Sequence, residues 1–218
     1  MHTDGFGKRR SSAPTIAEPV AKPLKRPRQA RAVFTVEAIY QALVRIWQRQ
    51  GWGAVTTRSV ALEAGVAVGT LYDYFPSKQA LLSGYVRYSL EQLRLTIEQQ
   101  LITPPELTWR QRLSGLIHLS CGQPNNPMFS LDTWRLEHVI AEPKHQKRAF
   151  EELSQSWLSV LKACPDLPCP ATLELAQALF MMAWGARRYS VLAQLPEPAQ
   201  QAWIARMEQA FVALIEAS

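Results

Sequence analysis

Residues 56–78 read TTRSVALEAGVAVGTLYDYFPSK, which has the pattern of two short helices joined by a tight turn. Thr56 or Thr57 is suited to the N-cap of the first helix, because a hydroxyl accepts from the free N–H groups of a first helical turn. Gly65 is predicted to end that helix, where the chain turns in a left-handed conformation. A second helix is predicted over about residues 68–75. Together these elements predict a helix-turn-helix.

Apolar side chains in this stretch recur at helical spacing. The residues expected to face inward are Val60, Ala61, Ala64, Val66, Leu71 and Phe75. Thr70, Tyr72 and Tyr74 are then expected to point mostly outward. Pro76 stops the second helix, and Ser77 is suited to cap the next one.

The motif AGVAVGTLYDYFPSK resembles the signature of the tetracycline-repressor (TetR) family of bacterial transcription regulators. The resemblance covers about residues 35–82 and is specific, because TTR, AGV, GTLYxYF and SK all stand at the family's spacing. Two positions differ: Ala67 stands where the family often has a capping serine, and Gln79 replaces a frequent glutamate. Residues 83–218 carry no family signature.

The resemblance implies an all-α regulator with an N-terminal three-helix DNA-binding domain and a C-terminal helical domain for ligand binding and dimerisation. The positions that it assigns to DNA phosphates are Thr57, Arg58, Tyr72, Tyr74 and Lys78. Those that it assigns to base edges are Val68, Gly69 and Thr70. The chemistry agrees, because hydroxyl and cationic groups donate to phosphate oxygens, and a threonine offers both a methyl and a hydroxyl group to a base. For the two tyrosines the alternative is that they pack the small domain.

Charge is concentrated at the N-terminal side of the chain. Residues 1–80 hold 12 Lys and Arg against 5 Asp and Glu, whereas the remaining residues hold 12 against 13. The formal net charge of +6 therefore comes from the N-terminal third. A basic module joined to a near-neutral body is typical of a protein that binds a polyanion. The alternative is a solvated basic surface without a partner.

We expect three parts: a disordered basic arm over residues 1–33, a helix-turn-helix DNA-binding domain over 34–80, and a helical effector-binding and dimerisation domain over 81–218. Proline, serine, alanine and basic residues dominate the arm, which has few large apolar groups. Its basic residues nearest to the first helix are Lys22, Lys25, Arg26, Arg28 and Arg31. They suit phosphate or minor-groove contacts, and a solvated tail is an equal alternative.

The first helix is predicted to start near Thr35 as the N-cap, with Phe34 and Ile39 as a hydrophobic staple, and to end at Gly51. A long helix is predicted from Ser77 to about residue 101. Further helices are predicted over residues 109–121, 131–142, 144–163, 172–192 and 198–216. No stretch alternates persistently at period two, so strands are not expected.

The last two predicted helices, 172–192 and 198–216, are the candidates for a homodimer interface, because they combine small residues with apolar side chains. Two helices from each of two chains would form a four-helix bundle. Paired heads would then read half-sites about 34–36 Å apart in a palindrome. In the alternative, these helices only close the core of the monomer.

An effector site is implied by the resemblance, because the family usually buries a small ligand in its C-terminal domain. Aromatic side chains with a few polar groups suit such a pocket. The candidates are Trp109, His118, Met128, Phe129, Trp134, His138, Met181, Trp184 and Arg187. The alternative is that these side chains belong to the core. The identity of the effector is open, and an activator or a ligand-independent regulator stands beside a repressor.

Several other classes find no support in the sequence. There is no glycine-rich phosphate loop, nucleophile elbow or HExxH pair, so we expect neither an enzyme nor a metal site or cofactor. No apolar run reaches the length of roughly 18 residues that a membrane span needs. Cys121, Cys164 and Cys169 match no zinc pattern and indicate a reducing cytoplasm, with a Cys164–Cys169 disulfide as the minor alternative. A helical protein-interaction module without DNA binding is the alternative class.

Overall fold

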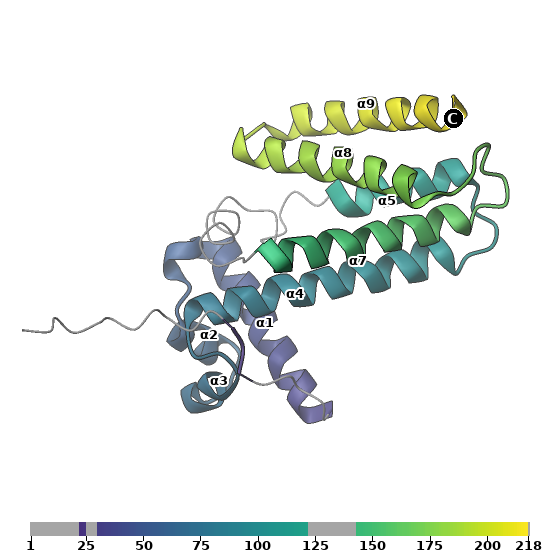
Figure 1. Ribbon diagram of the computed structural model, residues 1–218. Helices are drawn as coiled ribbons and strands as arrows, with labels where there is room; N and C mark the ends of the chain where they lie inside the picture. Colours follow the sequence, from purple (N-terminus) through teal and green to yellow (C-terminus); the bar gives the residue numbers. More distant parts are fainter. Residues whose placement is uncertain (1–21, 25–29, 122–142, 218) are drawn as a thin grey trace, which may run out of the picture.

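The computed structural model describes residues 22–24, 30–121 and 143–217, and the predicted all-α class is confirmed for them (Figure 1). The head consists of α1 (Ala30–Gln50), the short 3-10 helix η1 (Trp52–Ala54), α2 (Thr57–Glu63), α3 (Val68–Tyr74) and the first turns of α4 (Lys78–Ile97). The body consists of the rest of α4, its π-helical end η2 (Glu98–Ile102), α5 (Trp109–Cys121), α7 (Pro143–Lys162), α8 (Leu173–Leu192) and α9 (Glu197–Glu216).

The head is organised around α1, whose apolar side is covered by α2, α3 and the beginning of α4 (Figure 1). Ile39 and Leu43 of α1 are fully buried there, together with Leu71 of α3 and Leu81 of α4. The burial of these side chains supplies the main stabilisation of the head, because removing apolar surface from water is the dominant favourable term in folding.

The first helix starts earlier than predicted. It begins at Ala30, so the expected N-cap at Thr35 is wrong, and the Thr35 Oγ1 donates instead to the carbonyl of Arg31 inside the helix. Phe34 is 72% exposed, so it forms no hydrophobic staple. The physical reason is that the residues just before Thr35 include neither glycine nor proline and continue the helix backwards.

Part of the segment that we assigned to the arm is also ordered. Residues 22–24 lie against the head, where the Leu24 N–H donates to the Tyr74 carbonyl at the end of α3 over 2.8 Å. The chain therefore makes a long-range contact with the helix-turn-helix before α1 begins.

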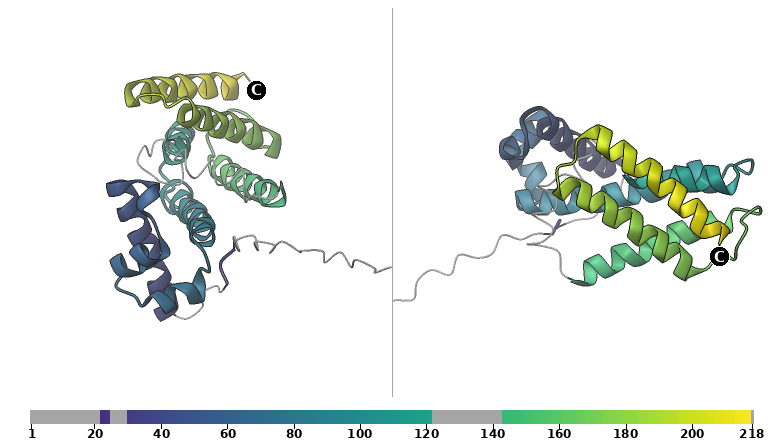
Figure 2. Two further views of the ribbon diagram at one scale, coloured as in Figure 1. Left: turned by 90° about the vertical axis from the view of Figure 1, so that its left-hand side faces the viewer. Right: turned by 90° about the horizontal axis from the view of Figure 1, so that it is seen from above.

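The body is built in layers. Figure 2 shows α8 and α9 as the outermost layer, α5 and α7 beneath them, and α4 between these helices and the head. The core of the body contains Trp157 of α7, Leu116 of α5, Leu179 of α8 and Phe211 of α9, each no more than 2% exposed. Trp184 of α8 packs against both the body core and the head core, so the two parts are in direct apolar contact.

Most predicted helices of the body are confirmed, within two residues at each end. Thr172 caps α8 by accepting from the Leu175 N–H. The helix predicted over residues 131–142 lies outside the described residues. Within the described ranges no helix is long and apolar enough to span a bilayer, and no group of three potential metal ligands occurs.

The three cysteines are free and buried, so the structure does not contain the Cys164–Cys169 disulfide. Burial raises the pKa of the Cys121 thiol to about 12 and that of the Cys164 thiol to about 11. Both thiols therefore stay protonated near neutral pH and are poor nucleophiles.

A buried arginine closes the end of the long helix. Arg112 of α5 is 1% exposed, and its guanidinium donates to the carbonyls of Leu101, Pro104 and Leu107. The last carbonyls of a helix have no partner inside the helix, so these hydrogen bonds satisfy the end of η2 and the turn that follows it.

We predict that Arg112→Met lowers the free energy of unfolding by roughly 2 to 4 kcal/mol, because it leaves several buried carbonyls without donors. Chemical denaturation measures this change. Arg110→Met is the matched control: the neighbouring Arg110 is exposed and pairs with Glu216 at the surface, so its loss should cost less than about 1 kcal/mol. Equal, small effects of the two substitutions would show that Arg112 does not support this helix end.

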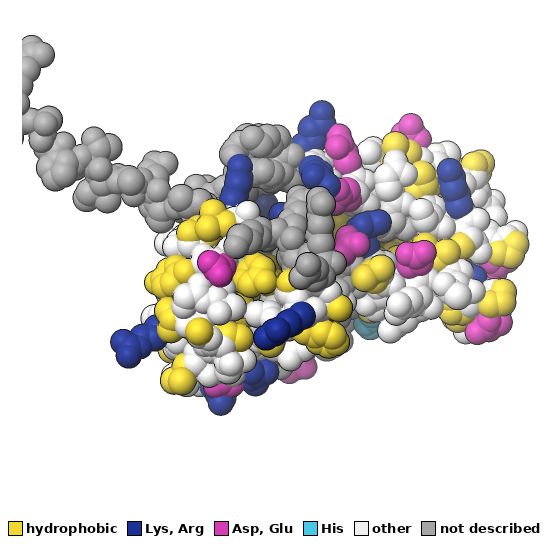
Figure 3. Space-filling model, turned by 90° about the horizontal axis from the view of Figure 1, so that it is seen from below, with side chains coloured by type: hydrophobic (Ala, Val, Ile, Leu, Met, Phe, Trp, Pro, Cys, Tyr) yellow, Lys and Arg dark blue, Asp and Glu magenta, His cyan; other side chains and the backbone are white. Residues whose placement is uncertain are grey.

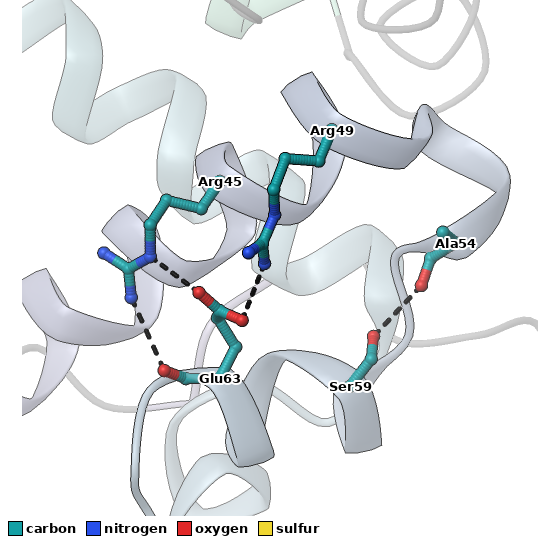
Figure 4. A network of polar contacts seen from close by, with 5 residues as sticks. All are labelled: Arg45, Arg49, Ala54, Ser59 and Glu63. Atoms are coloured by element: carbon teal, nitrogen blue, oxygen red, sulfur yellow. Dashed lines mark hydrogen bonds and ion pairs between the residues drawn. The ribbon is translucent and has the colours of Figure 1, made fainter.

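A pair of arginines on α1 holds the end of α2. Arg45 Nε donates to Glu63 Oε1 over 2.8 Å, and Arg49 Nη2 donates to Glu63 Oε2 over 2.7 Å (Figure 4). Hydrogen bonds from Arg45 and then Arg49 lower the pKa of the Glu63 carboxyl. A carboxyl with a lowered pKa in the folded state stabilises the fold above its unfolded pKa, and this contribution is lost as the pH falls through the folded pKa.

We predict that Glu63→Gln lowers the melting temperature slightly at neutral pH, and that the difference from the unchanged protein disappears at acidic pH and shrinks with added salt. Thermal melts over a pH series measure this difference. Glu91→Gln is the control, since Glu91 pairs with Arg94 of the same helix. A difference for Glu63→Gln that stays constant over the pH series would exclude the ion pairs as its cause.

Candidate nucleic-acid interface

The start of α2 is fixed by a capping box, and Thr56 is the N-cap of the two threonines that the sequence offered. Thr56 Oγ1 accepts from the Ser59 N–H over 2.9 Å, and Ser59 Oγ accepts from the Thr56 N–H over 3.0 Å. Ser59 Oγ also lies 3.0 Å from the Ala54 carbonyl, which ties the helix start to η1 (Figure 4). These bonds set the position of Thr57 and Arg58 in the first turn of α2.

The turn between α2 and α3 is also as predicted. Gly65 has φ +68, a conformation that L side chains rarely adopt, so glycine is required at this position. The Val66 N–H donates to the Ala61 carbonyl, and Val66 packs against the head core. The turn thus fixes where α3 begins relative to α2.

The helix α3 has one buried side and one exposed side. Leu71 within it and Phe75 just after it are fully buried, which confirms that they face inward. The three residues predicted to meet bases are less buried. Val68 is 39% exposed, Gly69 is exposed, and Thr70 is half-buried. Nothing lies within 4 Å of a Cβ added at Gly69, so the surface above it is open.

Two predicted phosphate contacts from different helices come together. The hydroxyls of Thr57 in α2 and Tyr72 in α3 share a hydrogen bond of 3.0 Å. Tyr72 is 46% exposed, and the neighbouring Arg58 is exposed as well. This hydrogen bond therefore joins the first turn of α2 to α3, and the two helices together present hydroxyl and guanidinium donors.

The other two predicted phosphate contacts have partners within the head. Lys78 Nζ donates to the Trp52 carbonyl over 2.7 Å and lies 3.8 Å from the centre of the Trp52 ring. Tyr74 packs against the head core, with its ring 6.3 Å from that of Phe75. For Tyr74, the structure thus shows the alternative in which the tyrosine packs the small domain. A phosphate contact by Tyr74 or by Lys78 stays a prediction.

Basic side chains are exposed on the side of the head on which α3 lies (Figure 3). Figure 3 views the side of the molecule on which α3 lies, and Lys and Arg side chains project at several places around the head.

Sequence reasoning did not single out Arg45, Arg49 or Trp52, whose partners stand far away in the sequence. The one signal in the sequence was the spacing of four residues between Arg45 and Arg49, which places both arginines on one face of α1.

The effector candidates are not all brought together. Phe129, Trp134 and His138, with Met128, lie outside the described residues, and the others are Trp109, His118, Met181, Trp184 and Arg187.

Among these, His118 is exposed and contacts Glu208 of α9 over 3.3 Å, so it lies on the surface between α5 and α9. Trp109 lies at the start of α5, whereas Cys121, which contacts α8, lies at its end, roughly 18 Å away along the helix axis.

Trp184 and Arg187 lie one turn apart on α8, where the partly buried Trp184 packs against the head core. Arg187 is 2% exposed and donates to Gln200 Oε1 over 2.8 Å. Burial lowers the pKa of its guanidinium, and the Cys121 thiol lies close enough to affect it. Cys121 Sγ is 3.5 Å from the Ala183 carbonyl. This part of α8 therefore contacts α5, α9 and the head.

Comparison with known proteins agrees with this geometry. The sequence pattern of the family described as "Bacterial regulatory proteins, tetR family" matches residues 39–84. The chain is 30% identical over 135 residues to the HTH-type transcriptional regulator BetI of Agrobacterium fabrum, covering 62% of this chain and 65% of that protein. It is 34% identical over 93 residues to the HTH-type transcriptional repressor KstR of Mycolicibacterium smegmatis, covering 42% and 45%.

These alignments span less than two thirds of the length of the curated relatives. The crystal structure of a TetR transcription regulator from Haloarcula marismortui extends the likeness to the whole fold. It matches with a TM-score of 0.62 over 84% of this chain and 97% of that chain, at 20% sequence identity. Residues 39–84 thus match the tetR family of bacterial regulatory proteins, and the fold as a whole is that of a TetR transcription regulator.

Proposed function

We propose that this chain is a cytoplasmic, homodimeric repressor of transcription that binds a palindromic DNA operator through the exposed side of α3. The observation that carries the proposal is the surface formed by Val68, Gly69 and Thr70 beside the hydrogen-bonded hydroxyls of Thr57 and Tyr72. A helix with one buried and one exposed side, flanked by phosphate donors, is the arrangement with which helix-turn-helix proteins enter the major groove. The similarity to a protein named as a repressor favours repression over activation.

The outer layer of the body supports dimerisation. Large apolar side chains are exposed along α8 and just beyond it, namely Met181, Met182, Tyr189, Leu192 and Leu195, and Leu214 of α9 is exposed as well. Contiguous exposed apolar surface marks interaction sites. Gly185 lies on the same side of α8, and a Cβ added there would meet nothing within 4 Å. The monomer does not need glycine at this position, whereas a closely packed partner helix would.

Control by a small effector has a physical route in the fold. Leu90 of α4 and Trp184 of α8 each pack against both the head core and the body core. A ligand that shifts α8 or α4 would change the separation of the two heads in the dimer and so weaken operator binding. By linkage, DNA would weaken the binding of that ligand by the same factor.

The proposed function is tested by titrating the purified protein with duplexes from its own upstream DNA and with a scrambled duplex at several salt concentrations. We expect tight binding to one upstream duplex, weaker binding to the scrambled one, and a steep fall of both affinities with salt. Binding to neither duplex at low salt would favour a protein-interaction module instead.

The roles of two interface residues are separable. We predict that Arg58→Met weakens binding to the operator and to the scrambled duplex alike and reduces the salt slope by about 1 for each chain of the dimer. Thr70→Val keeps the methyl group and removes the hydroxyl, so it should lower discrimination between bases by about 1 kcal/mol and leave the salt slope unchanged. An unaltered base preference in Thr70→Val would remove this hydroxyl from direct readout.

We predict that the double substitution Met181→Glu and Tyr189→Glu converts the dimer into a folded monomer, because buried like charges oppose an apolar interface. Sedimentation velocity measures the mass, and the monomer should lose operator affinity, since a single head reads only one half-site. Gln155→Glu on the exposed side of α7 is the control and should leave the dimer intact. A dimer that persists in the double variant would assign the interface to another surface.

A further inference from the structure

We infer that the segment Lys22–Leu24 is a positioning element for α3, and that it fastens the C-terminal end of this helix so that the base-reading side keeps a fixed orientation. The inference rests on the proposed function, because it assigns a specificity role to residues outside the helix-turn-helix. Three observations carry it: the weakness of α3 by itself, a backbone hydrogen bond at its end, and a proline wedged beside it.

The helix α3 has little stability of its own. It contains seven residues, about two turns, and isolated helices of this length are unstable in water. Its N-cap, Ala67, makes no side-chain hydrogen bond, so the free N–H groups of the first turn have no cap from that residue. The orientation of the exposed side therefore depends on how the rest of the helix is held.

The C-terminal end of α3 is held from outside the helix-turn-helix. Tyr74 is the last residue of α3, and its carbonyl is one of those that lack a partner within the helix. The Leu24 N–H donates to this carbonyl over 2.8 Å. The side chain of Leu24 is 59% exposed, so this contact is made by the backbone.

The residue before Leu24 is wedged between the end of α3 and α4. A Cβ added at Gly84 of α4 would lie 3.0 Å from Pro23 Cγ, 2.8 Å from Phe75 Cε1 and 2.6 Å from Tyr40 Oη. These three side chains therefore meet directly over the glycine, and Phe75 is the residue that follows α3. Proline has a restricted φ, which suits a short segment that must hold one position.

Together these contacts hold the C-terminal end of α3 in place, and neither of them involves a charged group. Side chains that read a ligand must be held within about 0.5 Å of their productive position. Loss of these contacts should therefore reduce the discrimination between operator and other DNA, while the electrostatic attraction to phosphates is unchanged.

Two substitutions at Leu24 separate the backbone bond from the side chain. Leu24→Pro removes the N–H donor, whereas Leu24→Ala keeps it and shortens only an exposed side chain. In the full-length dimer, we expect Leu24→Pro to weaken operator binding about fivefold, with unchanged affinity for the scrambled duplex and an unchanged salt slope. Leu24→Ala should bind like the unchanged protein. Equal operator affinities for the two variants would overturn the inference.

A deletion of residues 1–21 tests whether the segment merely tethers the residues before it. Leu24→Pro should cost the same factor in operator affinity in this shortened chain as in the full chain. If the substitution has no effect in the shortened chain, the segment acts through the preceding residues, and the positioning role is refuted.

Hydrogen exchange gives a readout that does not depend on DNA. The amides of α3 should exchange faster in Leu24→Pro than in Leu24→Ala, while those of α1 exchange at equal rates. If the unchanged protein binds no DNA, the proposed function fails, and this measurement still decides whether Lys22–Leu24 fastens α3. Equal exchange of α3 in the two variants would contradict the fastening itself.

Discussion

Helices of two turns are unstable alone, and α2 and α3 exist because their apolar sides are buried against α1 and the start of α4. This constraint divides each short helix into a side that must be apolar and a side that is free for other chemistry. Leu71 in α3 and Phe75 just after it are buried, which leaves Val68, Gly69 and Tyr72 exposed and Thr70 half-buried. The proposed DNA-reading surface thus consists of the residues of α3 that the head core does not bury.

Apolar burial stabilises the head, whereas polar contacts at its edges fix the orientation of its helices relative to one another. The capping box at Thr56 fixes the beginning of α2, the Arg45 and Arg49 pairs with Glu63 fix its end, and Lys78 on Trp52 fixes the beginning of α4. Exposed ion pairs contribute little free energy. Their value here is geometric, because each joins two elements whose relative position decides how the exposed side of α3 is presented.

The same packing connects the head to the rest of the molecule. The helix α4 runs from the head into the body, and Trp184 adds a second apolar contact between the two cores. The apolar side chains that a second chain would cover are exposed on α8 and α9. A single helix, α8, therefore contributes both to the proposed dimer surface and to the contact with the head, which is the arrangement that control of head separation requires.

Local features were accessible from the sequence alone. The caps at Thr56 and Ser77, the glycine turn at Gly65 and the inward positions of α3 depend on residues within a few positions of one another, and all are confirmed. The late start predicted for α1 failed for a local reason as well. A threonine can cap a helix or bond back to a carbonyl within it, and composition does not separate these two roles.

The sequence by itself therefore determined the helical class, the helix-turn-helix and the buried positions Leu71 and Phe75, because periodicity and capping act over one or two turns. Tyr74, which was expected to point mostly outward, packs against the head core instead. Only the tertiary structure decided which distant groups meet: Glu63 with the two arginines of α1, Trp52 with Lys78, Leu24 with the end of α3, and Trp184 with both cores. It also placed Arg187 in the interior and His118 at the surface. Such pairings depend on how whole helices cross, and no local pattern of residues encodes that geometry.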